Sequence, residues 1–407
     1  MRKCLEKTTA TPHIMNLKVG NFCVICFAVF IQVVHCHAVD PDVFRNITQL
    51  ITSKGYPCED HSVTTSDDFI LGIQRIPHGV HGLVGNEPRP VVYLQHGLLC
   101  DSTLWVTNIV KDSLAFLLAD AGFDVWLGNS RGNTYSRRHK TLSPKNPKFW
   151  DWSWDEMAQY DIPAVIDYII NTTGQQQLYY IGHSQGTLIG FSAFSQNQQI
   201  AKKVKLFIAL APVAYLGHTK TPLKILAHWP EQVYFEVFGD KDFLPSNWFF
   251  KLMALTACKD KLTLPICTNV LFLLCGYDYK NLNQSRLPVY VSHSPAGTSV
   301  KNMIHYSQAI QSGKYQNYDY GPGGNKQHYG QATPPQYNVS NMRTPVVLYS
   351  AVNDWLADPK DVSYLKSQLH TRYNSTEIAK WNHLDFAWGI DAGKILYSQL
   401  VQILKNL

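Results

Sequence analysis

Residues 178–188 read Leu-Tyr-Tyr-Ile-Gly-His-Ser-Gln-Gly-Thr-Leu, and this stretch decides the fold. A short apolar run enters a Gly-x-Ser-x-Gly motif, and the residues after the motif suit a buried helix. This order is typical of a nucleophile elbow, in which a strand turns sharply through a serine and a helix begins at once. The motif predicts that Ser184 stands at the carboxyl edge of a sheet, with a helix N-terminus behind it to favour developing negative charge. The alternative is a glycine–serine turn without chemistry, so the rest of the chain must supply a base, an orienting acid and an oxyanion hole.

Apolar runs and helical patterns alternate on both sides of this motif. Unbroken apolar strands are typical of parallel sheets covered on both faces, so the alternation predicts an α/β fold with a mostly parallel sheet. We expect its core to comprise residues 39–213 and 341–407. The expected helices are 43–55, 112–122, 155–171 and 390–407; the expected strands are 91–95, 123–127, 204–211, 345–352 and 376–380, the strand entering the elbow, and a hairpin of 61–65 with 69–76.

The alternation stops between residues 214 and 340, which we expect to form an inserted cap. This segment is rich in aromatic residues, Leu and Pro. It contains an apolar helical piece at 246–257, an apolar run at 270–274 and an irregular loop at 315–336 that is rich in Gly, Asn and Tyr. Two interpretations of the apolar stretches stay open. They form the ordinary core of the cap, or they form a lid that hides an acyl-binding cleft and meets a lipid surface when it opens.

The first 38 residues have the pattern of a secretory signal peptide. Lys18 precedes an apolar run at residues 22–34, and small residues lead to a cleavage position near Ala38. The run is shorter than the roughly 20 residues that span a bilayer, so an uncleaved anchor is the weaker alternative and we expect no transmembrane span in the mature chain. Met15 is a second candidate for the start of translation.

Charge, sequons and cysteines narrow the functional class. The formal net charge is +6, half of it within the predicted signal peptide, and no basic block stands out, which argues against nucleic acid as a partner. Nine cysteines leave five after the leader, and an odd number in an oxidising compartment means at least one free thiol. The chain has glycosylation sequons that agree with an extracellular or lysosomal destination, at Asn46, Asn171, Asn283, Asn338 and Asn374.

The residues after the elbow supply an acid and a base in the required order. In hydrolases built on such an elbow, the acid and the histidine follow the serine on loops after late strands. Asp354 follows the predicted strand 345–352 directly, whereas its rival Asp358 precedes a proline and resembles a helix cap. His383 follows the last short strand, whereas His370 ends a polar helical stretch and is expected at the surface. The pattern predicts Ser184 as nucleophile, His383 as general base and acid, and Asp354 as the orienting carboxylate.

An oxyanion hole needs two backbone N–H donors. One is expected from Gln185, directly after the nucleophile, and the other from the loop after strand 91–95, where the spacing favours Leu98. We find no metal-binding motif in the mature chain and no glycine-rich nucleotide loop after the first strands. The sequence therefore predicts catalysis without a metal or a cofactor.

Seven motifs, spread over the whole mature chain, resemble the animal acid lipases, the group of gastric and lysosomal acid lipases. The resemblance rests on residues 55–57, 71–77, 96–99, 128–132, 149–150, 182–186 and 382–386. It implies the α/β-hydrolase fold with helices on both faces of the sheet and an inserted cap with a lid. By the same resemblance, Ser184, Asp354 and His383 match the family's triad, and Leu98 and Gln185 match its oxyanion donors. Cys258 and Cys267 match its cap disulfide, with Cys275 as the unpaired thiol.

The resemblance implies a lipase that hydrolyses acylglycerols, and in some members sterol esters, at a lipid–water interface. Two rival functions stay open: a carboxylesterase for small soluble esters, and a non-catalytic lipid carrier on a hydrolase scaffold. Acyl chain length, pH optimum, oligomeric state and the choice between lysosome and extracellular fluid are not determined by the sequence.

Overall fold

The computed structural model describes residues 39–82, 88–246, 252, 258 and 263–407. The chain divides into residues 1–40 and the unit Pro41–Leu407, and the account below concerns the second unit. The predicted signal peptide lies outside the described residues, as does almost all of the apolar helical piece expected at 246–257. Within the described residues, no helix is both long enough and apolar enough to cross a membrane.

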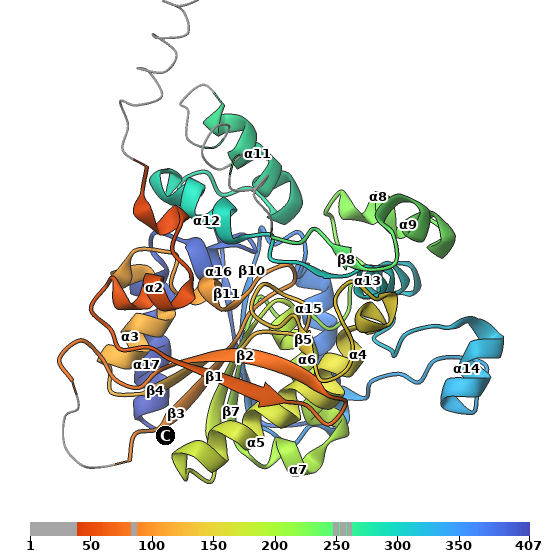
Figure 1. Ribbon diagram of the computed structural model, residues 1–407, viewed down its shortest axis with the longest axis horizontal. Helices are drawn as coiled ribbons and strands as arrows, with labels where there is room; N and C mark the ends of the chain where they lie inside the picture. Colours follow the sequence, from red (N-terminus) through yellow and green to blue (C-terminus); the bar gives the residue numbers. More distant parts are fainter. Residues whose placement is uncertain (1–38, 83–87, 247–251, 253–257, 259–262) are drawn as a thin grey trace, which may run out of the picture. The chain divides into compact units, whose positions relative to one another are not determined.

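A mixed sheet of nine strands forms the centre of this unit, in the order β1-β2-β4-β3-β6-β7-β10-β11 with β5 beside β2 (Figure 1). From β4 to β11 all neighbours are parallel, while β1, β2 and β5 are antiparallel additions at one edge. The strands are β1 (Glu59–Thr64), β2 (Phe69–Ile76), β3 (Val91–Gln95), β4 (Asp124–Leu127), β5 (Arg138–His139), β6 (Leu178–His183), β7 (Val204–Leu210), β10 (Val346–Ala351) and β11 (Tyr373–Ile378).

The predicted strands correspond to these elements, and the reason is visible in their burial. Every residue of β3, β4 and β6 is buried, as expected for strands covered on both faces, whereas β1 alternates because one of its faces is open. The short β5 has no periodic pattern of its own, and sequence reasoning missed it.

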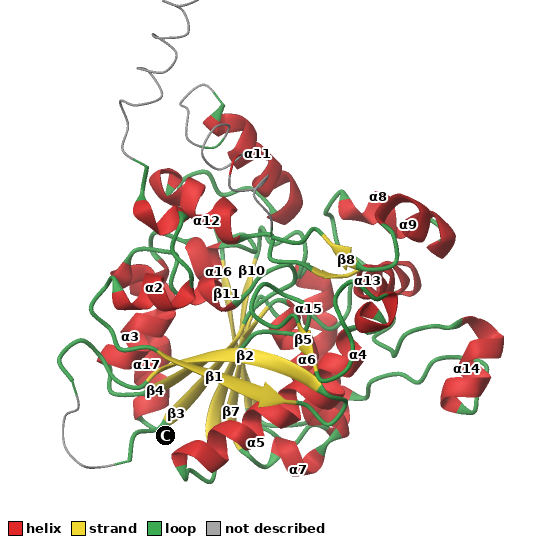
Figure 2. Cartoon of the chain, in the orientation of Figure 1, coloured by secondary structure: helices red, strands yellow, loops and turns green. Residues whose placement is uncertain are grey.

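Helices cover both faces of the sheet, with α3 and α17 on one side of the strands and α5, α6 and α15 on the other (Figure 2). One predicted helix, 155–171, consists of three pieces, because a π-helical turn joins α4 to α5. The core helices are η1 (Pro41–Val43), α2 (Ile47–Thr52), η2 (Ser102–Trp105), η3 (Val110–Asp112), α3 (Leu114–Asp120), η4 (Pro147–Trp150), α4 (Trp154–Glu156), η5 (Met157–Asp161), α5 (Ile162–Thr173), α6 (Gln185–Gln196), α7 (Gln198–Ala201), η7 (Val339–Asn341), α15 (Pro359–Gln368), α16 (Asp385–Trp388), η8 (Gly393–Tyr397) and α17 (Ser398–Lys405).

The segment between β7 and β10 is mostly helical, and most of it lies at the carboxyl ends of the parallel strands, with α14 set apart to one side (Figure 1). Part of it has a small core of its own, which packs against Leu98 and Leu99. Its described elements are α8 (Leu223–Ala227), α9 (Glu231–Phe238), β8 (Asp242–Phe243), α11 (Leu264–Cys275), η6 (Gln284–Arg286), α12 (Leu287–His293), β9 (Thr298–Ser299), α13 (Val300–Ser312) and α14 (Gly321–Tyr329).

Helix α14 corrects the expectation of an irregular loop at 315–336. Glycines lower helix propensity, which is why the pattern resembled a loop. The buried side chain of Asn325 compensates, because its oxygen accepts from Tyr320 N and its nitrogen donates to Asp319 and to the carbonyl of Ala332. A Cβ at Gly324 would lie 2.5 Å from the Cβ of Tyr320, so glycine is required there.

Candidate active site

Ser184 stands in a strained turn between β6 and α6. Its φ of 53° and ψ of −117° lie outside the regions that ordinary residues prefer, and α6 begins at the next residue. The flanking glycines are dictated by close approach. A Cβ at Gly182 would lie 2.6 Å from the backbone of Gly186, and one at Gly186 would lie 2.3 Å from the carbonyl oxygen of Gln95. The turn therefore has the geometry of a nucleophile elbow.

Three side chains that are distant in the sequence form a hydrogen-bonded chain. Ser184 Oγ lies 2.7 Å from His383 Nε2, and His383 Nδ1 lies 2.8 Å from Asp354 Oδ2 and 3.0 Å from Asp354 Oδ1. All three residues are buried, with Ser184 8% exposed and Asp354 0% exposed. The geometry allows the imidazole to take the proton of the hydroxyl while the carboxylate holds the opposite nitrogen.

The Asp354 carboxylate is held in place by its own loop. The loop leaves β10, and Asp354 Oδ1 accepts hydrogen bonds from the backbone N–H groups of Leu356 and Ala357 at 2.9 and 2.8 Å. These donors and the imidazole N–H together supply partners for a buried carboxylate, which would otherwise be costly.

The His383 loop is fixed by a turn of its own and by the cap. Asn382 Oδ1 accepts from Leu384 N, and Asp385 Oδ2 accepts from Asn382 N at 2.6 Å. The backbone N–H of His383 donates to the carbonyl of Cys275, at the end of α11, at 3.3 Å. Trp355, on the Asp354 loop, donates to the same carbonyl at 3.4 Å. One cap carbonyl thus connects both loops.

Two further histidines order the site, and sequence reasoning assigned neither of them a role. His183 Nε2 donates to the carbonyl of His383 at 3.0 Å, and burial lowers the pKa of His183 to about 3, so this ring stays neutral. His96 Nδ1 donates to the carbonyl of Gly97, while its Nε2 accepts from Ser130 N, and burial lowers its pKa as well. The only signal for them was their position inside the motifs 182–186 and 96–99.

The predicted oxyanion donors are both near Ser184: Leu98 lines the same cavity, and Gln185 is the next residue. Leu98 and Leu99 are the central residues of a turn closed by the hydrogen bond from Cys100 N to Gly97 O, and Leu99 has a φ of 58°. A Cβ at Gly97 would lie 3.1 Å from Ser184 Cβ, which shows how closely this turn approaches the nucleophile. Among the described residues, the backbone N–H groups of Leu98 and Gln185 have no acceptor, and both are therefore free to bind an oxyanion.

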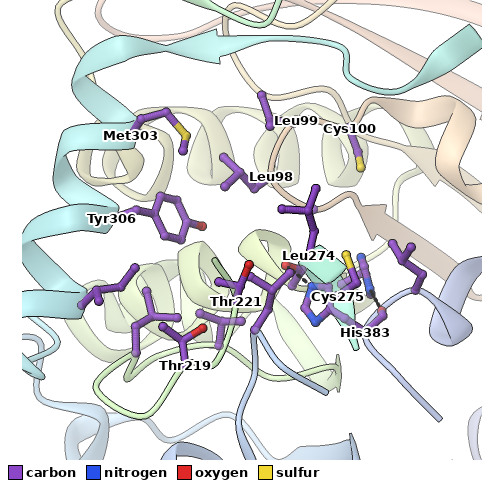
Figure 3. A pocket seen from close by; sticks show the side chains of 18 of the residues that line it. Leu98, Leu99, Cys100, Thr219, Thr221, Leu274, Cys275, Met303, Tyr306 and His383 are labelled. Carbon is purple, nitrogen blue, oxygen red and sulfur yellow. Dashed lines mark hydrogen bonds between the residues drawn. The ribbon is translucent and has the colours of Figure 1, made fainter. Parts of the chain in front are cut away.

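An apolar cavity of about 180 Å³ opens beside Ser184 and His383 (Figure 3). Residues of α13 line one wall, the Leu98–Leu99 turn lines another, and Leu274 and Cys275 bring the end of α11 to His383. Such a lining suits a hydrocarbon chain whose carbonyl carbon lies at Ser184. Other lining residues are Val213, Leu216, Thr219, Thr221, Tyr234, Leu356 and Leu384.

A buried ion network is centred on Arg131. Arg131, which is 1% exposed, donates to both carboxylate oxygens of Asp67 and makes three bonds to Asp161. Ser130, its neighbour, is the donor to His96. The motif at 128–132 therefore links the hairpin turn and the π-helical turn to the loop at 96–99.

The remaining predicted residues are placed as follows. His370 is exposed, and Asp358 is the N-cap of α15, accepting from Lys360 N at 2.9 Å. Cys258 and Cys267 form a disulfide, while Cys58, Cys100 and Cys275 are free. Within the described residues, no cluster of three His, Cys, Asp or Glu side chains could hold a metal. Four of the sequon asparagines are exposed, namely Asn46, Asn171, Asn338 and Asn374. The fifth, Asn283, is half-buried.

Comparison with known families identifies the fold. The model of the alpha/beta hydrolase fold family matches residues 90–390, and a partial alpha/beta-hydrolase lipase region matches residues 47–109. A putative lipase from Sulfolobus solfataricus has a similar structure, with a TM-score of 0.53 at 17% identity, over 86% of this chain and 99% of that one. A soluble variant of the monoglyceride lipase of Saccharomyces cerevisiae has a TM-score of 0.51 at 13% identity, over 86% of this chain and 98% of that one. The predicted α/β-hydrolase fold is confirmed.

Curated relatives are similar along nearly the whole chain. The human lysosomal acid lipase/cholesteryl ester hydrolase is 49% identical over 370 residues, which is 91% of this chain and 93% of the relative. The human gastric triacylglycerol lipase is 50% identical over 371 residues, with the same two shares. Human lipase member K is 50% identical over 369 residues, covering 90% and 92%.

Proposed function

The chain belongs to the acid lipases of the alpha/beta hydrolase fold family, and from this premise we propose that it hydrolyses ester bonds of neutral lipids through Ser184, His383 and Asp354. The observation that carries the proposal is the hydrogen-bonded chain from Ser184 to Asp354 at the wall of an apolar cavity. Triacylglycerols and sterol esters are the proposed substrates, since relatives of both kinds are equally similar.

The proposed reaction has two halves. His383 Nε2 takes the proton of Ser184 as the oxygen attacks the ester carbonyl, and the N–H groups of Leu98 and Gln185 bind the oxyanion. The tetrahedral intermediate then expels the alcohol, which takes the proton from His383, and the acyl group stays on Ser184. Water, deprotonated by His383, attacks the acyl-enzyme. The second tetrahedral intermediate then expels Ser184 Oγ, which takes the proton back from His383, and the fatty acid is released. The Asp354 carboxylate stabilises the imidazolium in both halves, and no metal or cofactor enters.

The apolar surface of the cap supports a lipid interface as the site of action. On α11, Ile266, Val270 and Leu273 are 62%, 52% and 44% exposed, while Leu274 on the same helix lines the cavity. A helix with apolar groups facing both inward and outward suits a lid that exchanges water for lipid when it opens. Passage through the secretory route to the lysosome or the extracellular fluid agrees with the leader, the sequons and the disulfide.

Three experiments test the proposal. The purified chain from residue 39 onward is assayed on a panel of triglycerides and cholesteryl esters between pH 4 and 8. A lipase gains rate sharply when a single ester passes its solubility limit, whereas a carboxylesterase for soluble esters shows no such rise. An organophosphate should label the wild type and not Ser184→Ala; failure to label the wild type would favour a non-catalytic carrier.

A further inference from the structure

Helix α13 has two faces with different surroundings, each formed by a stripe of side chains along the helix. Its side chains at positions 303, 306, 307 and 310 line the apolar cavity. Those at 302, 305 and 309 are buried away from it. Spacings of three and four residues place each set on one face of the helix. The helix therefore lines the cavity with one face and packs into the buried interior with the other.

Asn302, on the core-facing stripe, is directed at the elbow. It is 0% exposed, and its Nδ2 donates to Gln185 Oε1 at 2.9 Å and to Thr298 Oγ1 at 3.0 Å. Among the described residues its own Oδ1, also buried, has no hydrogen-bond partner. Leaving a buried acceptor unpaired is unfavourable, and an apolar side chain would avoid it. Unlike an apolar side chain, Asn302 donates a hydrogen bond to Gln185.

The Gln185 side chain is held at both ends. Its Oε1 also accepts from the hydroxyl of Tyr306 at 3.3 Å, and its Nε2 lies 3.6 Å from Met157 Sδ. Gln185 is 2% exposed and is the first residue of α6, where backbone N–H groups have no intrahelical acceptor. Restraining this side chain restrains the direction of the N–H on the same Cα, which is the proposed oxyanion donor.

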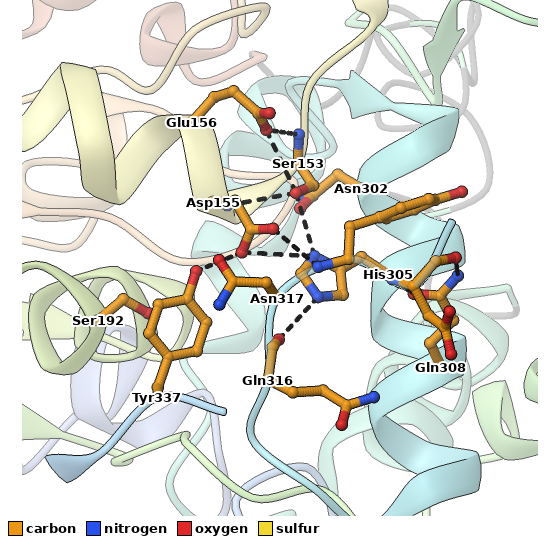
Figure 4. A network of polar contacts seen from close by, with 12 residues as sticks. Ser153, Asp155, Glu156, Ser192, Asn302, His305, Gln308, Gln316, Asn317 and Tyr337 are labelled. Atoms are coloured by element: carbon orange, nitrogen blue, oxygen red, sulfur yellow. Dashed lines mark hydrogen bonds and ion pairs between the residues drawn. The ribbon is translucent and has the colours of Figure 1, made fainter. Parts of the chain in front are cut away.

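Helix α13 is itself anchored firmly enough to act as a fixed reference. Its N-cap Ser299 accepts from Asn302 N at 2.9 Å and donates to the carbonyl of Trp152. His305 Nδ1 lies 3.1 Å from Ser153 Oγ, and its Nε2 lies 3.0 Å from the carbonyl of Gln316. Figure 4 shows Asn302 and His305 pointing from α13 toward the segment that carries Ser153 and Asp155.

We propose that Asn302 is a positioning residue for hydrolysis: by binding the Gln185 side chain, it aligns the Gln185 N–H with the oxyanion. Tyr306 acts with it as the second, longer hydrogen bond. This inference rests on the proposed function, because it requires Gln185 to be an oxyanion donor. It also assigns to a cap helix a role in the chemical step, beyond covering the cavity.

The test replaces Asn302 with leucine, which has a similar size and cannot donate. With a soluble p-nitrophenyl ester we expect kcat to fall by about 10- to 100-fold with KM unchanged, because a donor misplaced by a fraction of an ångström loses much of its effect in the transition state only. Gln308→Ala is the matched control, since it removes two hydrogen bonds from α13 to Asp319 without touching Gln185, and its kcat should stay at the wild-type value.

A double-mutant cycle decides whether Asn302 acts through Gln185. Gln185→Leu keeps the backbone N–H and removes the side chain, so it should reproduce the loss of Asn302→Leu, and the double variant should lose no more than either single one. Additive losses would overturn the inference, as would a folded Asn302→Leu whose kcat lies within about twofold of the wild type.

Two further readouts keep the test decisive. If Asn302→Leu does not fold, Tyr306→Phe removes the weaker hydrogen bond with little change of volume, and an unchanged kcat in that variant overturns the inference. Organophosphate labelling of Ser184 separates the two levels of the argument. A wild type that is neither labelled nor active refutes the proposed function. An active wild type together with an unchanged kcat in Asn302→Leu refutes only the positioning role.

Discussion

The sheet core and the cap differ in where they place their apolar side chains. In β3, β4 and β6 every residue is buried, and the loops that follow these and later strands hold the reacting groups. In the cap, by contrast, α9 and α11 expose apolar side chains to solvent, including Val237 at 56% and Ile266 at 62%. The difference teaches that the core positions Ser184, His383 and Asp354, while the outer cap helices carry an exposed apolar surface.

The division is not absolute, because the inner ends of two cap helices hold core groups. The Cys275 carbonyl, at the end of α11, accepts hydrogen bonds from Trp355 and His383. Asn302, on α13, binds Gln185. A Cβ at Gly276 would lie 1.9 Å from the carbonyl oxygen of Asn353, so the chain passes as closely to the Asp354 loop as a glycine permits. The cap thus has an exterior that exposes apolar side chains to solvent and an interior that contacts the loops around Ser184 and His383.

The largest expected effect tests the core. Asp354→Asn keeps the shape of the loop but removes the charge that selects the productive tautomer of His383, so kcat should fall by about 10⁴-fold with little change in stability. Asp358→Asn is the matched control: it is also buried, on the same loop, but it caps α15 and does not contact His383. The control should lose stability and retain kcat. Equal losses of kcat in the two variants would contradict the assignment of the acid.

The next effect tests the cap alone. Removing the disulfide with Cys258→Ser and Cys267→Ser frees a loop of about ten residues, which should cost about 2.5–3 kcal/mol of stability on the loop-entropy account. Because the catalytic loops lie in the core, we expect kcat on a soluble ester to stay close to the wild-type value. Denaturant unfolding and a soluble-ester assay, run on the same preparation, measure the two quantities. A loss of kcat without a loss of stability would contradict the division between core and cap.

A third prediction concerns pH and the loop that carries His383. Burial raises the pKa of Asp385 to about 8, whereas an unfolded aspartate titrates near about 3.9. Between these values the folded chain keeps a proton that the unfolded chain has released, so this group's contribution to stability is full below about pH 4 and is lost as the pH rises toward 8.

Asp385→Asn stays neutral at every pH. Its free energy of unfolding should therefore be closer to that of the wild type at pH 5 and higher than that of the wild type at pH 8. The difference between variant and wild type should change by about 1 kcal/mol or more between the two conditions. Urea unfolding at both pH values measures this difference. Glu236→Gln, an exposed carboxyl on α9, is the control and should shift stability equally at the two pH values. If Asp385→Asn also shifts stability equally at the two pH values, this carboxyl is ionised in the folded chain.

The smallest expected effect sharpens the function of the outer cap. Val270→Ser with Leu273→Ser removes apolar surface from the outer side of α11, and we expect a several-fold lower rate on an emulsified triglyceride with an unchanged rate on a dissolved ester. Ile395→Ser, at a residue 37% exposed on the core, is the control and should change neither rate. If the dissolved ester is affected equally, these side chains support the cap rather than the interface.

The predicted strands and the turn at Ser184 could be read from the sequence, because each depends on neighbours within a few residues. Asp354 and His383 could be proposed because each directly follows a predicted strand. Apolar runs indicated strands that are buried on both faces, and glycines indicated the close approach of two backbones at the elbow. The helix α14 was missed for the same reason: its local propensity is poor, and the tertiary contacts of Asn325 and Tyr320 decide it.

The sequence by itself thus determined the scaffold, the family and the residues proposed for the chemistry. The tertiary structure alone decided that His183 holds the His383 loop, that His96 is tied to the segment carrying Arg131, and that Asn302 reaches Gln185. The physical reason is distance along the chain. Ser184 and His383 are separated by 199 positions, and Gln185 and Asn302 by 117, so no local periodicity couples them. Only the register of a parallel sheet and the packing of an inserted helix bring such groups within hydrogen-bonding distance.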